Sequence, residues 1–328
     1  MTLSTSIVVC AYTEERWGDL VAAIESLRLQ TRAPLEMILV SDHNRALYER
    51  ARSLLPDVVA VENEETRGLS GARNTGVTAA QGEIVAFLDD DAVAEPDWLE
   101  RLAAHYTDPK VIGVGGSVDA DWLEGRPRFF PREFDWVVGC SYRGMPESTS
   151  RVRNPIGANM SFRAQVLSRT GGFTSGIGRV GTRPVGCEET ELCIRAARQH
   201  PEGIILYDPA ARVHHRVPAS RAHWRYFRSR CYSEGLSKAL VARCAGPADA
   251  LSAERSYALR TLPSGVWQGL GHGIAGDPGG LGRAGAIVAG LAITSYGYGA
   301  GILATRRASS RRGTARDGVV QPVPVASK

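Results

Sequence analysis

The sequence predicts an α/β fold: a doubly wound, mostly parallel sheet of Rossmann-like type, followed by a C-terminal helical extension. From about residue 5 to about 118, short β-branched or aromatic runs alternate with amphipathic segments of helical length. This alternation is typical of a doubly wound sheet. The 328 residues are 43% hydrophobic, which is enough to fill a sizeable core.

The first half of the chain contains five predicted strands with helices between them. In the first helix Leu20, Ile24 and Leu27 fall on one face, as expected for a helix that packs on a sheet. The strands are "SIVVCAY", "LEMILVSD", "DVVAVE", "EIVAFLDD" and "VIGVGGSV", and the helices cover residues 18–30, 44–54, 70–81 and 96–106.

The second half is less regular. Prolines and aromatics in "EGRPRFFPREFDW" predict an extended excursion within 119–155. An extended piece and a short helix follow in "NPIGANMSFRAQVLSRTGGF", then the glycine-rich "GIGRVGTRPVG". We then expect a helix at "EETELCIRAARQH", two strands at "GIILYD" and "ARVHHRV", and a long helix over 220–244.

Charge and cysteine content exclude some classes of protein. The net charge of +4 is modest and much of the excess lies in "RRASSRRGTAR" at 306–316, so the body shows no basic surface that would indicate nucleic acid binding. Six cysteines without a CxxC pair predict a reducing compartment and no zinc ribbon. The chain starts with a strand pattern instead of a signal peptide, so we expect a cytosolic domain.

A second compositional feature lies near the C-terminus. Residues 284–305 are 22 residues without a charge, close to the ~20 that span a bilayer. Gly297 and Gly301 have the spacing of close helix packing. A single span would place the basic tail outside, against the positive-inside tendency, whereas an interfacial helix or a re-entrant pair with "LPSGVWQGLGHGIAG" keeps it cytosolic. The alternative is a glycine-rich helix packed on the protein.

The stretch "FLDDDAV" at 87–93 places three carboxylates at the end of a buried strand. A solvated acidic loop is one explanation. In open α/β sheets, however, ligands bind at the carboxyl ends of strands. Mg2+ is typically held by one or two carboxylates together with substrate phosphates. The stretch therefore predicts a metal and nucleoside diphosphate site.

Several motifs in order resemble one family. The set is "VVCAYTEE", "LVSD", "RGLSGARNTG", "FLDDDA", "GANMSFR", "GGF" and "EETELCIR…YDPAARVHH". It resembles the inverting family 2 glycosyltransferases of GT-A fold, which use nucleotide-sugar donors, over about residues 5–240. The resemblance implies a catalytic domain over 1–240, with a nucleotide-sugar half at about 1–118 and an acceptor half at about 119–218. A membrane-associating segment at 241–305 and a basic, disordered tail at 306–328 would follow.

The resemblance implies a set of nucleotide-binding residues. Ala11, Tyr12 and Glu14 would surround the base and ribose, although an ordinary turn is the alternative. Asp42 could accept a hydrogen bond from uracil or guanine. Relatives usually have a second Asp and a Gly here, whereas this chain has "SDHN", so the base stays open.

The motif "RGLSGARNTG" contributes cationic candidates. Its small residues let a helix approach the sheet, while Arg73 and Asn74 would point toward the pocket. Arg67 is a further candidate for the phosphates or the base. Alternatively, Arg73 braces an aspartate of the "FLDDD" strand.

The family's D-x-D motif corresponds to Asp89 and Asp91. Asp91 would bind Mn2+ or Mg2+ most directly, with Asp90 near the ribose. The metal would neutralise charge on the departing diphosphate. Some relatives complete the metal site with a histidine, for which His214 is the first candidate and His215 the second; a structural histidine is the alternative.

An inverting transfer needs one general base. The family's acidic motif corresponds to Glu188 and Glu189, with Glu189 in the base position where relatives usually have Asp. Acids in a first helical turn also favour the helix dipole, which is the structural alternative. Asn159 and Arg163 would bind the acceptor.

Together these features predict a metal-dependent inverting glycosyltransferase at the cytoplasmic face of a membrane. It would transfer a sugar from a UDP- or GDP-sugar to the hydroxyl of a sugar or lipid-linked acceptor, and would bind no nucleic acid. A nucleotidyltransferase would need a glycine-rich phosphate loop, which "CAYTEERWGD" lacks. A non-catalytic sugar- or lipid-binding scaffold would not need the acidic motifs.

Overall fold

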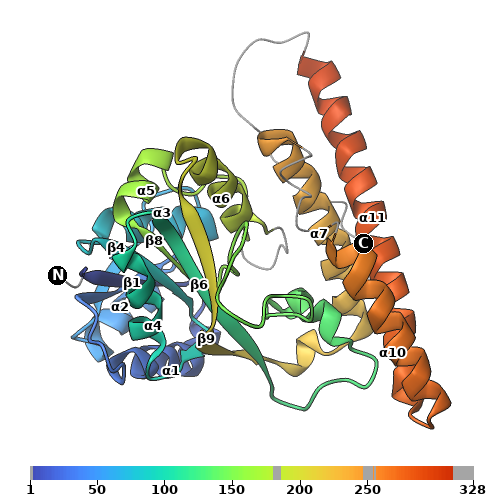
Figure 1. The fold of residues 1–328 in the computed structure, drawn as a ribbon. Coiled ribbons are helices and arrows are strands. Elements are labelled where there is room, and N and C mark those ends of the chain that lie inside the picture. Colours follow the sequence, from blue (N-terminus) through green and yellow to red (C-terminus); the bar gives the residue numbers. More distant parts are fainter. Residues whose placement is uncertain (1–2, 180–185, 247–253, 255, 313–328) are drawn as a thin grey trace.

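A central mixed sheet and a separate layer of long helices make up the protein (Figure 1). The structure is a computed structural model that describes residues 3–179, 186–246, 254 and 256–312. The strand order is β3-β2-β1-β4-β8-β6-β9-β5, with β7 also paired to β9. The predicted α/β class is confirmed.

Four parallel strands form the first half of the sheet: β1 (Thr5–Ala11), β2 (Glu36–Ser41), β3 (Val59–Glu62) and β4 (Ile84–Asp89). Cys10 of β1 lies opposite both Val40 of β2 and Asp89 of β4. The carboxyl ends of these strands therefore meet at one edge, where ligands bind in such sheets.

The second half of the sheet is mixed. β8 (Asn159–Arg163) runs antiparallel between β4 and β6 (Val111–Trp122), and β6 is parallel to β9 (Ile204–Val217). The short strands β5 (Ala92–Ala94) and β7 (Ser150–Arg151) pair antiparallel with β9. The two strands predicted at "GIILYD" and "ARVHHRV" are one strand, because a register shift between Gly116 and Ser117 absorbs the extra residues without ending the pairing.

The helices that cover the sheet lie close to their predicted positions: α1 (Trp17–Arg28), α2 (Arg45–Leu54), α3 (Leu69–Ala79), α4 (Trp98–Ala104), α5 (Ala164–Thr170) and α6 (Glu188–Gln199). Short 3-10 helices lie at η1 (Glu14–Arg16), η2 (His105–Thr107), η3 (Arg132–Val138) and η4 (Ala219–Arg221), and η5 (Tyr257–Thr261) is a short π-helix. A Cβ at Gly76 of α3 would lie 2.4 Å from Val8, so this glycine permits the predicted close approach to β1.

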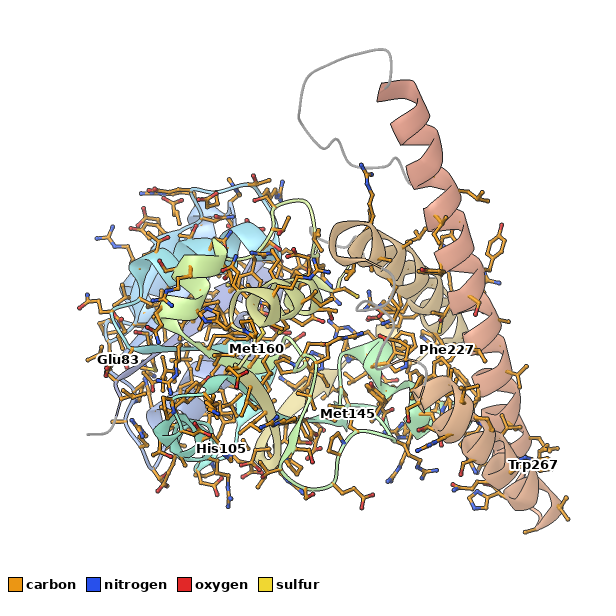
Figure 2. All side chains as sticks on the ribbon, turned by 45° about the horizontal axis from the view of Figure 1, so that its top comes forward. Glu83, His105, Met145, Met160, Phe227 and Trp267 are labelled. Atoms are coloured by element: carbon orange, nitrogen blue, oxygen red, sulfur yellow. The ribbon has the colours of Figure 1, made fainter. Side chains whose placement is uncertain are left out.

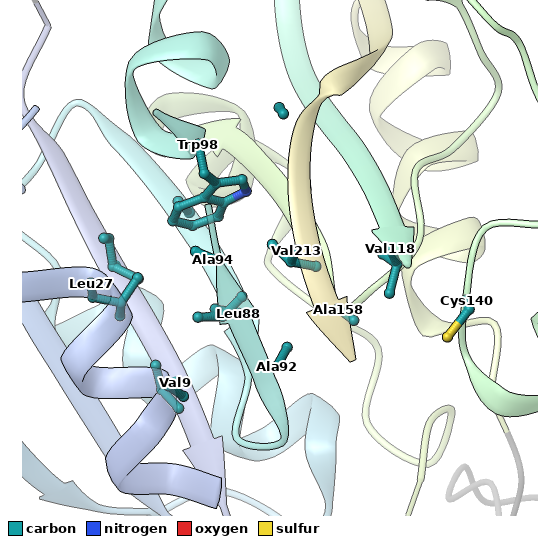
Figure 3. Packing of buried hydrophobic residues seen from close by; sticks show 14 of the residues in the cluster. Val9, Leu27, Leu88, Ala92, Ala94, Trp98, Val118, Cys140, Ala158 and Val213 are labelled. Carbon is teal, nitrogen blue, oxygen red and sulfur yellow. The ribbon is translucent and has the colours of Figure 1, made fainter. Parts of the chain in front are cut away.

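The main core fills the space between the sheet and α1 and α4. Figure 3 shows Leu27, Leu88, Trp98 and Val213 converging there from separate elements. Trp98 is fully buried and donates its indole N–H to Asn159 Oδ1 over 2.8 Å. The same core continues to Phe227 in the helical layer. The two parts are thus packed together.

The helical layer consists of α7 (Trp224–Ala245), α10 (Leu262–Ile274) and α11 (Pro278–Arg312) (Figure 1). A Cβ at Gly235 of α7 would lie 2.2 Å from the carbonyl oxygen of Thr294, and one at Gly297 would lie 2.3 Å from that of Tyr232. The small residues of the uncharged segment therefore pack against α7 of the same chain. α11 also continues past residue 305 into the predicted tail, whose residues 313–328 lie outside the described part.

The outer side of α11 is apolar and uncovered. The segment Pro278–Ala304 contains an 18-residue window with a mean hydropathy of 1.5, of which 28% is buried, and by length and composition the segment could cross a membrane. Large side chains recur every seven or eight residues along this side, which is helical spacing. They are Leu281, Val288, Tyr296 and Leu303, between 54% and 72% exposed.

Candidate active site

An Asp-Asp-His group lies at the carboxyl edge of β4. Asp89, Asp91 and His215 each offer a ligand atom, and these atoms all lie within 4.8 Å of one another. His215 arrives from β9 because it pairs with Ala92 of β5, directly after the acidic run. Two carboxylates and one imidazole suit a divalent ion such as Mn2+. The residues present therefore fit the metal that the sequence predicts.

The structure corrects the first histidine candidate. Neighbouring residues of a strand face opposite sides of the sheet, so His214 points away from the acids when His215 points toward them. His214 Nε2 lies 2.6 Å from Glu95 Oε1, and both side chains are partly exposed. His215, the second candidate, is the histidine of the Asp-Asp-His group.

Three cationic groups surround the buried Asp91 carboxylate. Arg16 Nη1 lies 2.7 Å from Oδ2, Arg221 Nη2 lies 3.3 Å from it, and His215 Nε2 lies 3.1 Å from Oδ1. Burial opposes ionisation, but these cations hold the pKa of Asp91 well below its usual range. Asp91 is therefore ionised, and the arginines beside it can also donate hydrogen bonds to phosphate oxygens.

Sequence reasoning missed Arg16 and Arg221. Both lie on single-turn helices, η1 and η4, and neither falls in a motif that marked the site. Only the fold brings them to one carboxylate. Arg16 also reaches Asp90, with 3.0 Å between Nη2 and Oδ2. Burial and the adjacent Asp91 charge raise the pKa of Asp90 to about 8.

Arg73 connects the Asp-Asp-His group to the start of α6. Its guanidinium is 2% exposed and lies 2.7 Å from Glu188 Oε1 through Nη1 and 3.5 Å from Asp89 Oδ1 through Nη2. Nη2 also donates to the Gly157 carbonyl over 3.0 Å. Arg73 thus makes the contact with an aspartate of β4 that the sequence offered as one alternative, and a shorter one with Glu188.

The two adjacent glutamates have different surroundings. Glu188 is buried and ion-paired with Arg73, whereas Glu189 is only partly buried and accepts a hydrogen bond from the Thr190 hydroxyl over 3.1 Å. Burial and the Glu188 charge raise the pKa of Glu189 to about 8. A carboxyl with such a pKa can take up a proton near neutral pH.

Residues of the helical layer hold the beginning of α6. Gly186 N donates to Ser237 Oγ of α7 over 3.1 Å, and Cys187 Sγ lies 3.5 Å from Glu234 Oε1. Cys187 has a φ of 71°, an unusual left-handed conformation for a non-glycine residue. The position of Glu189 therefore depends on α7 as well as on the sheet.

Comparison with known proteins agrees with this geometry. Residues 6–171 match the family described as Glycosyl transferase family 2. Over 243 residues, 73% of this chain and 77% of the relative, the chain is 39% identical to the glucosyl-dolichyl phosphate glucuronosyltransferase of Haloferax volcanii. The chain belongs to glycosyltransferase family 2.

Other relatives are more distant. The succinoglycan biosynthesis protein ExoM of Rhizobium meliloti is 27% identical over 71% of this chain and 74% of its own length. The mannosyltransferase PcManGT from Pyrobaculum calidifontis, solved with GDP-Man and Mn2+, superposes with a TM-score of 0.55 at 17% identity, over 90% of this chain and 88% of that one. This family 2 glycosyltransferase therefore has the GT-A fold, which sets aside the nucleotidyltransferase alternative.

The glycosyltransferase places its predicted nucleotide residues along the carboxyl edge. Asp42, which directly follows β2, accepts hydrogen bonds from Asn63 Nδ2 at 2.6 Å and Gly68 N at 3.0 Å, so its carboxylate is held in one orientation. Tyr12 lies under the Arg16 guanidinium, with 5.0 Å to the ring centroid. Asp42 and Tyr12 thus lie on the same rim as the Asp-Asp-His group.

The other predicted contacts on this side are more peripheral. Glu14 lies 3.7 Å from Arg50, and both side chains are about 40% exposed. Ala11 is buried, and its carbonyl oxygen accepts a hydrogen bond from Asp42 N. Arg67 lines a small surface hollow together with residues 176–179, and Asn74 donates to the Phe173 carbonyl.

The structure gives Asn159 and Arg163 other partners than an acceptor. Asn159 is fully buried, donates to the carbonyls of Ser117 and Ala211, and accepts from Trp98. Arg163 pairs with Ile84, at the opposite end of β4 from Asp89, and binds backbone carbonyls there. Both residues thus support the sheet, which corrects the acceptor-binding prediction.

Proposed function

We propose that this glycosyltransferase transfers a sugar, with inversion, from a nucleoside diphosphate sugar to a hydroxyl of a lipid-linked acceptor. The main support for this proposal is the bridge that Arg73 forms between Glu188 and Asp89. It fixes the helix that bears Glu189 relative to Asp89 of the candidate metal group. The buried Arg73 guanidinium thereby holds the proposed cation site on the donor side and the proposed base on the acceptor side in a fixed arrangement.

On the donor side, Asp89, Asp91 and His215 would hold Mn2+ or Mg2+. When bound, the ion would neutralise charge on the diphosphate leaving group. Arg16 and Arg221 lie against Asp91 and can turn to phosphate oxygens, for which guanidinium groups are well suited. Asp42 is oriented to accept a hydrogen bond from the base. The structure solved with GDP-Man and Mn2+ supports such a donor by analogy of fold.

On the acceptor side, Glu189 is the proposed general base. Glu188 is committed to Arg73, which leaves Glu189 as the carboxylate able to receive a proton. The acceptor oxygen attacks the anomeric carbon as the bond from that carbon to the diphosphate oxygen breaks. The hydroxyl proton passes to Glu189, and the diphosphate leaves on the opposite face, so the configuration inverts.

Two observations support a lipid-linked acceptor: the similarity to the relative from Haloferax volcanii and the apolar helical layer. The relative from Haloferax volcanii is named for a glucosyl-dolichyl phosphate substrate, and we propose an acceptor of that lipid-linked kind here. A protein that uses such a lipid must reach a membrane, and the uncovered apolar side of α11 offers the contact.

We propose that α11 lies in the plane of the membrane surface on the cytoplasmic side. α11 packs along α7 through Gly297, and the adjoining α7 carries the Glu234–Lys238 ion pair. A bilayer that surrounded α11 would have to admit these charges, at a cost of several kcal/mol. Contact along one face avoids that cost.

A transfer assay tests the proposal directly. The full chain would be incubated with single nucleotide sugars, Mn2+, and a polyprenyl-phosphate-linked monosaccharide in detergent. We expect a lipid-linked product whose new linkage has the inverted configuration. Addition of EDTA should abolish its formation. Equal transfer to a free monosaccharide would contradict the lipid-linked acceptor, and full activity in EDTA would contradict the metal.

A further inference from the structure

An arginine-lined cavity lies between η3, α10 and α11, apart from the Asp-Asp-His group. Its volume is about 240 Å³. Four arginines, Arg126, Arg132, Arg143 and Arg283, line it together with a single carboxylate, that of Glu133. We propose that this cavity binds the phosphate group of an anionic membrane lipid. The proposal concerns a second site and does not depend on the transferase reaction.

Three of the four guanidinium groups are already paired. Arg126 makes a double contact with Asp135, at 2.6 and 2.8 Å, and Arg283 Nη2 lies 2.7 Å from Asp277 Oδ2. Arg143 Nη1 lies 3.1 Å from Glu133 Oε1 and 2.6 Å from Gln268 Oε1.

Arg132 is the excess cation of the cavity. Its side chain is exposed, and its guanidinium makes no hydrogen bond or ion pair with the residues that the structure describes. A single excess guanidinium, with three more beside it, matches a ligand that carries one negative charge and several acceptor oxygens. A phosphate ester has this chemistry, and arginine binds it through two parallel N–H donors.

The position of the cavity points to a lipid and not to a free anion. α10 lines the cavity with Gln268 and His272, while its outer side carries Trp267, which is 73% exposed, and Ile274, which is 89% exposed. Figure 2 shows Trp267 on the outer side of the helical layer. Tryptophan concentrates at the headgroup level of membranes. An α10 seated with Trp267 at that level would hold the arginine cavity beside the lipid phosphates.

The cavity is also connected to the candidate active site along the chain. η3 begins with Arg132 at the cavity and ends at Val138. Two residues later, Cys140 Sγ lies 3.9 Å from His215 Nδ1. A lipid held by its phosphate at this cavity would therefore dock the protein with the Asp-Asp-His group close to the membrane surface.

Vesicle flotation of the full chain, without donor or metal, tests the inference. The vesicles would be phosphatidylcholine alone or phosphatidylcholine with phosphatidylglycerol. We expect Arg132→Glu to weaken binding to the anionic vesicles by roughly 10-fold, the scale of a reversed charge near the surface, and to leave binding to phosphatidylcholine unchanged. Arg132→Lys should retain most of the binding. Arg52→Glu, which changes an exposed arginine on α2 across the sheet from α10 (Figure 1), is the charge-matched control and should change it little.

Three outcomes would overturn the site. Equal losses in Arg132→Glu and Arg52→Glu would show that only net charge matters. Unchanged binding of a normally melting Arg132→Glu protein would show that the cavity takes no lipid. Competition by millimolar inorganic phosphate, with chloride at equal ionic strength having no effect, would assign the cavity to a soluble anion.

Discussion

The Nε2 atom of His215 lies 3.1 Å from the Oδ1 atom of Asp91, and both side chains are almost completely buried. Burial disfavours a charged imidazole, but the Asp91 carboxylate outweighs it and raises the pKa of His215 well above its usual range. A metal ion needs the neutral imidazole. A proton and a metal ion bound at the Asp-Asp-His group would therefore compete for the same side chain.

Substitution of the two neighbouring histidines separates a metal ligand from a surface residue. We expect His215→Gln to weaken Mn2+-dependent binding of a nucleoside diphosphate at least 10-fold, the scale for a lost contact of a metal site. His214→Gln removes only the partly exposed pair with Glu95 and should bind normally. Calorimetric titration with and without Mn2+ measures both. A stronger effect in His214→Gln would reject the Asp-Asp-His assignment.

The adjacent glutamates can be separated in the same way. Glu189→Gln should keep donor affinity and lower turnover by about 100-fold or more, the usual scale of general-base help. Glu188→Gln removes the closer of the two carboxylate partners of buried Arg73, so we expect a lowered melting temperature as its main effect. Steady-state rates and thermal melts of both variants measure the difference. A fully active Glu189→Gln enzyme would mean that the base lies elsewhere.

The raised pKa of Glu189 predicts a pH dependence. The base acts only when ionised, and with a pKa of about 8 most molecules carry the inactive, protonated form at pH 7. We expect kcat/KM to rise with pH through neutrality and to level off above about 8. The residual activity of Glu189→Gln should lack this rise. A profile that is flat from pH 6 to 9 in the unchanged enzyme would contradict the assignment.

Glycine packing between α7 and α11 predicts opposite effects for two alanine substitutions. Gly235→Ala would place a Cβ 2.2 Å from the Thr294 carbonyl oxygen and should destabilise the protein by about 1–3 kcal/mol. Gly299→Ala meets nothing within 4 Å and should be neutral or stabilise α11 by up to ~1 kcal/mol. Denaturant unfolding measures both changes. Equal stability of the two variants would show that the helices do not touch as described.

The apolar outer side of the helical layer predicts salt-resistant membrane binding. Ile274→Asp changes a side chain that is 89% exposed and should release protein from phosphatidylcholine vesicles even at high salt, where surface charges are screened. Leu29→Asp changes a side chain that is 72% exposed at the end of α1 and serves as the matched control. Flotation at several salt concentrations compares them. Equal release of both variants would argue against a membrane-facing layer.

The sequence by itself determined the order of strands and helices and the position of the acidic motifs at the carboxyl edge of the sheet. Strand and helix periodicity depends on nearest neighbours along the chain, so α1 to α6 could be placed within a few residues. The "DDD" run begins at the last residue of β4, and parallel strands bring their carboxyl ends to one edge, so an acidic site there followed from local pattern alone. The division into domains at 240 and 305 stays a prediction, and α7 and α11 cross those boundaries.

Only the tertiary structure decided which side chains meet. The alternation of side chains along β9 decided between His214 and His215, because neighbouring residues of a strand point to opposite faces of the sheet. Long-range packing brought Arg16 and Arg221 to Asp91, joined Arg73 to Glu188, and turned Asn159 into a buried support. Each of these contacts joins residues far apart in the chain, and a hydrogen bond or ion pair depends on distances of about 3 Å that no local pattern encodes.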